Sequence, residues 1–405
     1  MKNKRRAPWL ALILAALLMM PLLSASSFWQ SASQTDRDTV TISREEYERL
    51  KQYELLDEVK NYVDTYFFEE PDQQLLMDGA IQGLLSGLGD AYSFYYPQEA
   101  WAQMHEEDEG KYAGIGVQML GDYESGAVTI TRVFRNTPAE AAGLKKGDVF
   151  LTVEDIQVTT ATMQDAVNVM RGIPGEAVHI EVVRQGEVLP FDLIKAEIIV
   201  NRVEYMMLDD KVGYIMLFEF AGGSAEAFTT AFEALKAQGM AGLIIDLRDN
   251  PGGWVDDGVK IADLFLDRAL LYYAEDRAGS QEKFYTTDGK DDLPLVVLVN
   301  ENSASSSEIV TAALKDYDRA IVVGEQTFGK GIIQYVIPLS DNKSGFQFTY
   351  AQYFSPLGNK VHKEGVTPHI LSEMPEELKS VFFDFGSLED PQLAQAYEEM
   401  KKLVH

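Results

Sequence analysis

Ser305 is the first residue whose type and position suggest chemistry. It falls in the tight connection between an apolar strand predicted at 295–300 and a helix predicted from about residue 306 to 315. At a helix mouth, unpaired backbone N–H groups and the positive end of the dipole stabilise a serine alkoxide or an oxyanion. Ser305 and Glu308 also form a capping-box pattern, and from this segment alone that structural interpretation stays open.

Lys330 is the second such residue, in a glycine turn beyond the next predicted strand. A lysine acts as general base for a serine only if burial lowers its pKa, by roughly 3–5 units for a fully buried amine. In a right-handed strand–helix–strand unit, the loop after the second strand leaves the sheet at the same edge as the helix mouth. We therefore expect Lys330 to lie near Ser305, and a solvated loop amine is the alternative. The side chains expected to keep the amine dry are Phe328, Ile332 and Ile333.

A third turn follows the strand predicted at 242–247, where the sequence reads Asp249-Asn-Pro-Gly252-Gly253. Two successive glycines let backbone N–H groups approach a ligand closely. Taken alone, the pattern is equally that of an ordinary turn.

The elements that must position these residues follow from hydrophobic periodicity. From about residue 200 onward, predicted strands and helices alternate, which indicates crossover units and a largely parallel sheet. Residues 111–195 instead hold short β-branched runs cut by Gly and Pro, with one helix near 163–170, and predict a small strand-rich domain. Apolar residues spaced by three and four predict two amphipathic helices, at 55–66 and 75–85.

The first 30 residues resemble an export signal. Basic residues at 2–6 precede an apolar run of 17 residues from Ala7 to Leu23, and small residues follow. The run fits either a retained membrane anchor or a cleaved signal peptide. The charge asymmetry predicts that everything beyond residue 30 lies outside the cytoplasm.

Composition excludes several classes of function. The chain has 35 basic and 64 acidic residues and a net charge of −29, which argues against binding to nucleic acid. It has no cysteine, which excludes disulfides and thiol nucleophiles, and its five histidines argue against imidazole-rich metal sites. We expect no metal and no cofactor.

Together the motifs resemble the C-terminal processing peptidases, serine peptidases with a Ser–Lys active site in which a PDZ domain is joined to a crotonase-like α/β core. The resemblance runs from about residue 75 to 370. It rests on four segments, GLGDAYS at 87–93, DLRDNPGG at 246–253, NSASSSEI at 302–309 and GEQTFGKGIIQ at 324–334.

The resemblance implies a role for each matching residue. Ser305 would be the nucleophile, Lys330 its general base, and Gln334 the group that orients the lysine amine. The oxyanion hole would be formed by the backbone N–H groups of Ser306, Gly252 and Gly253. Asp316, His362 and His369 are expected not to take part in catalysis.

The strand-rich segment resembles a PDZ domain. Its carboxylate-binding loop, which would hold a peptide C-terminus, is expected at Gly114, Ile115, Gly116 and Val117. Arg171 resembles an arginine placed between PDZ and peptidase domains, where it would couple peptide binding to assembly of the active site.

The implied organisation is a signal or anchor at 1–30, a tether and helical region at 31–105, a PDZ domain at 106–195, a peptidase core at 196–380 and a helical tail at 381–405. The expected activity is that of an exported serine endopeptidase acting on proteins or peptides with exposed C-termini. Family analogy adds a homodimer through helices in 41–105, and the first segment implies contact with a membrane. The alternative is a PDZ adaptor without hydrolytic activity. The presence of both Ser305 and Lys330 favours the enzyme.

Overall fold

The computed structural model describes residues 40–122, 125–378, 381 and 383–404. The chain divides into two compact units, residues 1–77 and 78–405, which are described separately. The predicted export segment at 1–30 lies outside the described residues. Within the described ranges, no helix combines the length and the apolar content needed to cross a bilayer.

The first unit contains α2 (Arg44–Lys51) and α3 (Glu54–Tyr66), and α4 (Gln73–Ser86) runs across its boundary. The two predicted helices are thus confirmed, and α2 is added before them. α2 begins at a capping box in which Ser43 and Glu46 bond each other's backbone N–H groups. Neither α2 nor α3 buries a residue, and α3 leaves a row of apolar side chains exposed.

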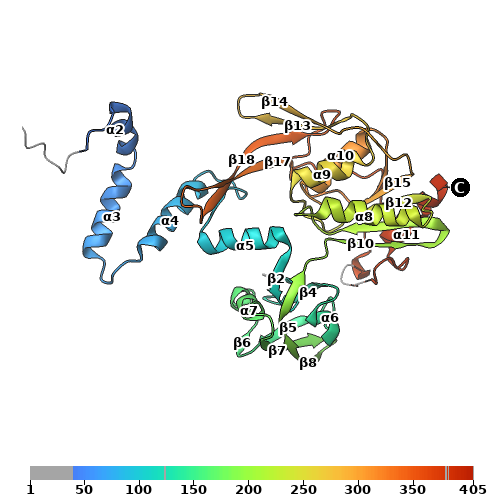
Figure 1. Cartoon of the computed structure of the whole chain (residues 1–405), viewed down its shortest axis with the longest axis horizontal. Helices are drawn as coiled ribbons and strands as arrows, with labels where there is room; N and C mark the ends of the chain where they lie inside the picture. The colour runs from blue at the N-terminus through green and yellow to red at the C-terminus, as the bar shows by residue number, and fades with distance from the viewer. Residues whose placement is uncertain (1–39, 123–124, 379–380, 382, 405) are drawn as a thin grey trace, which may run out of the picture. The chain divides into compact units, whose positions relative to one another are not determined.

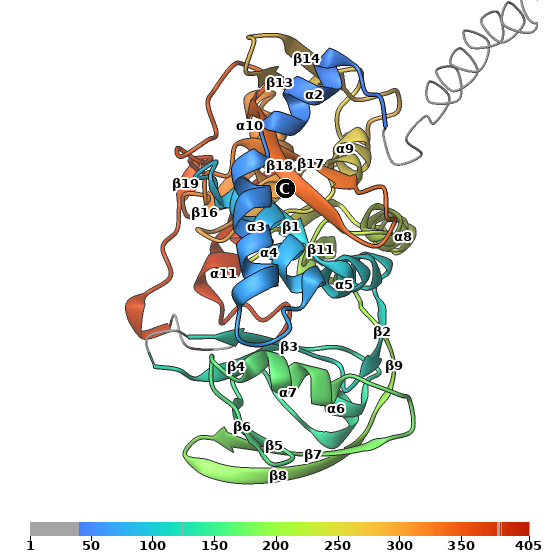
Figure 2. The same ribbon diagram turned by 90° about the vertical axis from the view of Figure 1, so that its left-hand side faces the viewer.

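The strand-rich region forms a sheet in the order β3 (Val117–Gly121), β4 (Val128–Val133), β5 (Val149–Val153), β7 (Ala177–Arg184) and β8 (Glu187–Ile194). β6 (Ile156–Gln157) pairs with β5, and α6 (Pro138–Ala142) and α7 (Met163–Met170) complete the region (Figure 2). The predicted strands and the predicted helix are all present. β3 is one of the two edge strands of this sheet, with one edge unpaired among the described residues. The chain enters and leaves this region through the pair β2 (Lys111–Gly114) and β9 (Ala196–Ile199).

The second half of the chain is built on a six-stranded sheet. Its order is β10 (Val203–Met207), β11 (Val212–Leu217), β12 (Gly242–Asp246), β15 (Leu295–Val299), β16 (Ile321–Gly324) and β19 (Ile370–Leu371). Every neighbouring pair is parallel except β10 with β11, which confirms the predicted crossover organisation.

Helices cover both faces of this sheet (Figure 1). α8 (Ser224–Ala237), α9 (Val255–Asp263) and α10 (Ser306–Asp316) contribute to the larger apolar cluster, and α11 (Pro391–Val404) packs on the opposite face. All residues of β12 and β15 are buried, as expected for strands enclosed on both sides.

A second sheet is centred on β18 (Gly345–Phe354). β17 (Ile332–Pro338) pairs with residues 345–352 of β18, while β1 (Phe94–Tyr96) and β13 (Leu270–Asp276) share its other side. β14 (Gln281–Tyr285) adds to β13, and α5 (Gln98–Glu109) follows β1. This sheet matters for function because β17 begins two residues after Lys330 and β1 follows the turn at 87–93.

Candidate active site

Ser305 lies at the predicted helix mouth, as the residue directly before α10. Its backbone has φ 55° and ψ −114°, a region that costs a non-glycine residue about 1–3 kcal/mol. Surrounding hydrogen bonds hold this conformation. The Ser305 N–H donates to Glu308 Oε2 at 2.9 Å, and the Tyr353 hydroxyl donates to the Ser305 carbonyl at 3.1 Å. The serine is thus fixed at the end of a buried helix with only 9% of its surface exposed.

Glu308 joins the serine segment to the lysine segment. Its carboxylate is fully buried and accepts four hydrogen bonds. Besides Ser305, the donors are the Lys330 N–H at 2.8 Å, the Gly329 N–H at 2.7 Å and the Thr327 hydroxyl at 2.5 Å. Burial raises the pKa of Glu308, and these hydrogen bonds oppose the rise. The Glu308 of the capping pattern therefore also joins the loop that carries Ser305 to the turn that carries Lys330. The sequence did not predict this connection, which is called the clamp below.

The Lys330 side chain is half-buried, and desolvation lowers the pKa of its amine against the opposing charges of Glu308 and Asp90. Its Nζ lies 4.8 Å from the centre of the Tyr92 ring. Within the part of the chain that the structure describes, the amine forms no hydrogen bond with Ser305. A Cβ on the next residue, Gly331, would come within 2.1 Å of the backbone nitrogen of His362, so the turn requires glycine there.

One prediction about the surroundings of Lys330 is wrong. Ile332 is buried and Ile333 is half-buried, as expected. The Phe328 side chain is 55% exposed, and the ring next to the amine is that of Tyr92.

Gln334 sits on β17 at a bulge between Ile333 and Gln334. Its side-chain amide donates to Thr349 Oγ1 on β18 at 3.1 Å, and no hydrogen bond to Lys330 is present among the described residues. It also lines a pocket of 520 Å³ whose other walls come from α5, the start of α9 and β17. The structure thus places the predicted triad on adjoining segments without joining the three side chains by hydrogen bonds.

The predicted oxyanion donors differ in their availability. In the described part of the chain, the N–H groups of Ser306 and Gly253 donate no hydrogen bond. The Gly252 N–H already donates to Asn250 Oδ1 at 2.9 Å, so in this structure Gly252 is not a free donor. A Cβ on Gly252 would lie 2.7 Å from the Ser305 Cβ. Glycine is therefore required at position 252 because the backbone there lies close to Ser305.

Asn250 is a site residue that sequence reasoning missed. It is fully buried, and its side-chain amide also donates to the Leu217 carbonyl at 2.8 Å. Its own carbonyl accepts hydrogen bonds from the Ala304 N–H and the Ser307 hydroxyl, both at 3.0 Å. Asn250 thus joins the turn at 249–253 to the loop that carries Ser305. The only sequence signal was its place in the Asn-Pro-Gly-Gly turn.

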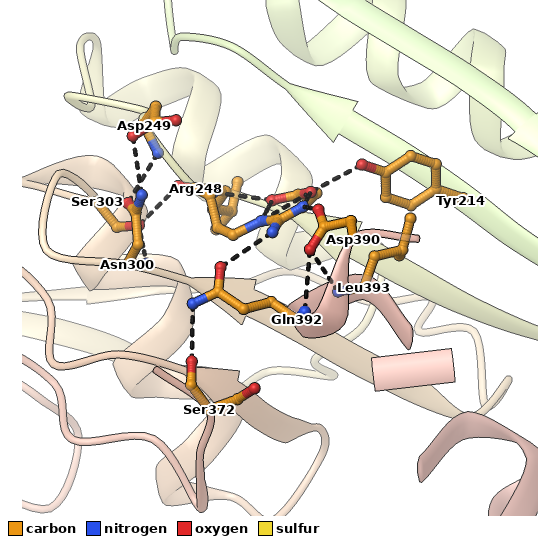
Figure 3. A network of polar contacts seen from close by, with 11 residues as sticks. Tyr214, Arg248, Asp249, Asn300, Ser303, Ser372, Asp390, Gln392 and Leu393 are labelled. Atoms are coloured by element: carbon orange, nitrogen blue, oxygen red, sulfur yellow. Dashed lines mark hydrogen bonds and ion pairs between the residues drawn. The ribbon is translucent and has the colours of Figure 1, made fainter. Parts of the chain in front are cut away.

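A buried polar network surrounds Arg248, just before this turn in the chain (Figure 3). Arg248 contacts Asp246 at 2.7 Å and Asp390 at 2.8 Å, and donates to Gln392 Oε1 at 3.0 Å. Burial alone would lower the pKa of Arg248, but the negative charges of Asp246 and Asp390 have the larger effect and raise this pKa. Because Asp390 and Gln392 lie at the start of α11, the network ties the C-terminal helix to the strand end that leads to the glycine turn.

The predicted carboxylate-binding loop lies between β2 and β3. Within the described chain, the N–H groups of Ile115 and Gly116 donate no hydrogen bond. Gly114 pairs with Ala196 and Val117 with Val133 at the ends of the two strands.

Arg171 follows the last residue of α7. Its guanidinium pairs with Glu106 of α5 at 3.3 Å and lies 4.9 Å from the centre of the Tyr112 ring.

The residues expected to be non-catalytic have structural partners. Asp316 accepts hydrogen bonds from the Ser355 and Asn359 side chains and from the Leu357 N–H. The His369 ring accepts the Val322 N–H at 3.0 Å. In the described part of the chain, neither His369 nor His362 is bonded to Ser305.

Comparison with known protein families assigns most of the chain. A profile of peptidase family S41 matches residues 211–372, and a PDZ domain profile matches residues 112–194. A profile of the activating protease CtpB N-terminal domain matches residues 16–100.

Individual proteins show the same likeness. The carboxy-terminal processing protease CtpB of Bacillus subtilis is 32% identical over 349 residues, covering 84% of this chain and 71% of that protein. The carboxyl-terminal-processing protease of Synechocystis is 35% identical over 304 residues, covering 73% and 71%. The solved photosystem II D1 C-terminal processing protease has a TM-score of 0.54 at 28% identity, covering 86% of this chain and 96% of that one. A putative S41 protease from Bacteroides fragilis shares the fold, with a TM-score of 0.57 at 17% identity over 84% of this chain and 92% of that one.

Proposed function

We propose a reaction for this chain from one established premise: it belongs to the C-terminal processing peptidases, a family of serine-type peptidases that carry a PDZ domain. The proposed activity is endoproteolysis by a Ser305–Lys330 dyad on substrates bound by their C-termini. The observation that carries it is the shared Glu308 carboxylate, which binds the backbone of both Ser305 and Lys330.

The proposed chemistry begins with a neutral Lys330 amine, since an ammonium cannot accept a proton. The amine takes the proton of the Ser305 hydroxyl while Oγ attacks the substrate carbonyl. The N–H groups of Ser306 and Gly253 stabilise the oxyanion, and each such donor is worth about 3 kcal/mol in the transition state. Gln334 orients the amine.

Collapse of the tetrahedral intermediate breaks the peptide C–N bond, and the Lys330 ammonium returns its proton to the leaving amine. An acyl-enzyme on Ser305 remains. Water then attacks the ester while Lys330 accepts one of its protons. The Oγ–C bond breaks, Lys330 returns the proton to Ser305 Oγ, and the product carboxylate leaves. The surroundings of Lys330 support this role because burial already disfavours its charged form.

The PDZ region is proposed to bind the substrate C-terminus. In the described part of the chain, the N–H groups of Ile115 and Gly116 donate no hydrogen bond and one edge of β3 has no partner strand, which suits a carboxylate and addition of the peptide as a strand. Arg171 is proposed to couple this binding to the active site. Its partner Glu106 supports that role because it lies on α5, and other residues of α5 share a pocket with Gln334.

Several broader features also belong to the proposal. The core is proposed to be crotonase-like, on the strength of its strand–helix crossovers, with the domain boundaries at 106–195 and 196–380 predicted from the sequence. The first 30 residues are proposed to export the chain and either to anchor it in the membrane or to be removed, so that it works outside the cytoplasm. A homodimer through the helices of the first unit is proposed because α2 and α3 bury no residue within the chain.

The test compares cleavage of an unfolded, tail-bearing protein by the wild type, Ser305→Ala and Lys330→Ala, with the exposed-lysine variant Lys343→Ala as matched control. The proposal expects cleavage by the wild type and Lys343→Ala and none by the other two. Undiminished cleavage by either active-site variant would refute the dyad. Peptide binding by a wild type that never cleaves would instead favour the adaptor.

A further inference from the structure

The turn Asp90–Ser93, part of the GLGDAYS segment, has no role in the chemistry described so far. It is nevertheless tightly built. The Asp90 carboxylate accepts the Tyr92 N–H at 3.2 Å and the Ser93 hydroxyl at 2.5 Å. Gln347 of β18 donates to the Tyr92 carbonyl at 2.9 Å. The turn is therefore bonded to β18, the strand that pairs with β17, which carries Gln334.

From this turn, the Tyr92 ring contacts the amine of Lys330, 4.8 Å from the ring centre. The face of an aromatic ring attracts a cation, so this contact favours the ammonium over the neutral amine. The negative charge of Asp90 acts on the amine in the same sense.

Gln334 is tied to the same turn through Thr349. Its amide donates to Thr349 Oγ1, and the Thr349 N–H donates to the Ser93 hydroxyl oxygen at 3.1 Å. The Thr349 side chain also helps to lower the pKa of Asp90. The base and its proposed orienting partner thus both contact this turn, Gln334 through Thr349, and no hydrogen bond among the described residues joins either of them to Ser305.

We propose that the turn Asp90–Ser93 is a resting site that holds Lys330 and Gln334 apart from Ser305, and that Tyr92 is the positioning residue for the general base. The inference rests on the proposed Ser305–Lys330 chemistry. The amine must leave the Tyr92 ring to accept the serine proton, and a resting place that favours the ammonium opposes that step.

The charged groups around the amine come from three segments. Glu308 of α10 and Asp90 of the turn both favour the ammonium. His362 lies close enough to Asp90 to interact with it, and Lys360 and Lys363 stand beside His362. The ring of Tyr92, unlike these groups, can be removed without changing any charge. Its replacement therefore tests the ring contact with the amine alone.

The test measures the pH dependence of kcat/KM for Tyr92→Leu, Tyr92→Phe and the wild type. Leucine keeps an apolar side chain but removes the ring. The midpoint of the rise in kcat/KM is expected to move about half a pH unit lower, giving about threefold more activity at a fixed pH on the acid side. Phenylalanine keeps the ring and is expected to retain the wild-type midpoint. Phe328→Leu removes an exposed ring from the turn that carries Lys330, and it is also expected to retain the wild-type midpoint.

A second variant, Thr349→Val, releases Gln334 without touching the ring and is expected to raise kcat at constant KM. An unshifted midpoint in Tyr92→Leu, or an equal loss at every pH, would overturn the inference, and so would a phenylalanine variant that behaves like leucine. Should Tyr92→Leu fail to fold, a Thr349→Val variant with unchanged or lower kcat would overturn it. Failure of the underlying chemistry is distinguishable, because Lys330→Ala would then still cleave.

Discussion

Replacing Glu308 by glutamine tests the clamp that brings the two loops together. Each carboxylate oxygen accepts two hydrogen bonds, Oε1 from Thr327 and Gly329, and Oε2 from Ser305 and Lys330. A glutamine amide offers one oxygen and one NH₂ group, so in either orientation two donors lose their acceptor. Hydrogen bonds to a charged group are worth about 1.5–3 kcal/mol each. Removal of a buried charge offsets part of this loss.

We expect a net loss of about 3 kcal/mol in the free energy of unfolding, or a fall in Tm of roughly 5–10 °C. Peptide cleavage should fall at least tenfold, because the serine and lysine loops are no longer fixed to a common acceptor. The assays are chemical denaturation and cleavage of a fluorogenic peptide. Glu301→Gln is the matched control, since it makes the same charge change at an exposed position in the preceding turn. A Glu308→Gln protein within 1 kcal/mol of wild type and fully active would refute the reasoning.

Three further outcomes follow from the structure. Arg248→Lys should lower the free energy of unfolding by about 2–4 kcal/mol, because Asp246 loses a buried bidentate partner. Chemical denaturation measures this loss, and Arg277→Lys, at an exposed position, should leave the free energy of unfolding unchanged. For the wild type, kcat/KM should rise with pH through a midpoint below the ordinary lysine pKa of 10.5, because burial lowers the pKa of Lys330. The Lys330→Arg variant should be inactive at every pH. A peptide ending in a carboxamide should bind the loop at 115–116 about ten- to a hundredfold more weakly than its free acid, measured by fluorescence anisotropy.

The sequence predicted those parts of the site that depend on local rules. Hydrophobic runs and turn residues located the strand ends before Ser305 and Lys330, and the handedness of crossover connections placed both at one sheet edge. Burial of Lys330 was expected, and its side chain is half-buried. These inferences needed only the neighbours of each residue in the chain.

The parts that were missed depend on contacts between distant segments. Tyr92 reaches Lys330 across more than 200 residues, and no local pattern distinguishes its ring from any other exposed or core tyrosine. The same holds for the second sheet, in which Gln347 bonds a carbonyl near β1. Gly252 was assigned as a donor by its type, whereas its N–H is taken by Asn250, a pairing that only the folded turn reveals.

The central claim is that Ser305 is a nucleophile activated by Lys330, and covalent labelling tests it most directly. The purified chain would be treated with a fluorophosphonate and the modified residue located by mass spectrometry of its peptides. The account predicts one adduct, on Ser305, whose rate of formation rises with pH and which Lys330→Arg does not form. An adduct on another serine, or equal labelling of Ser305 in Lys330→Arg, would contradict it.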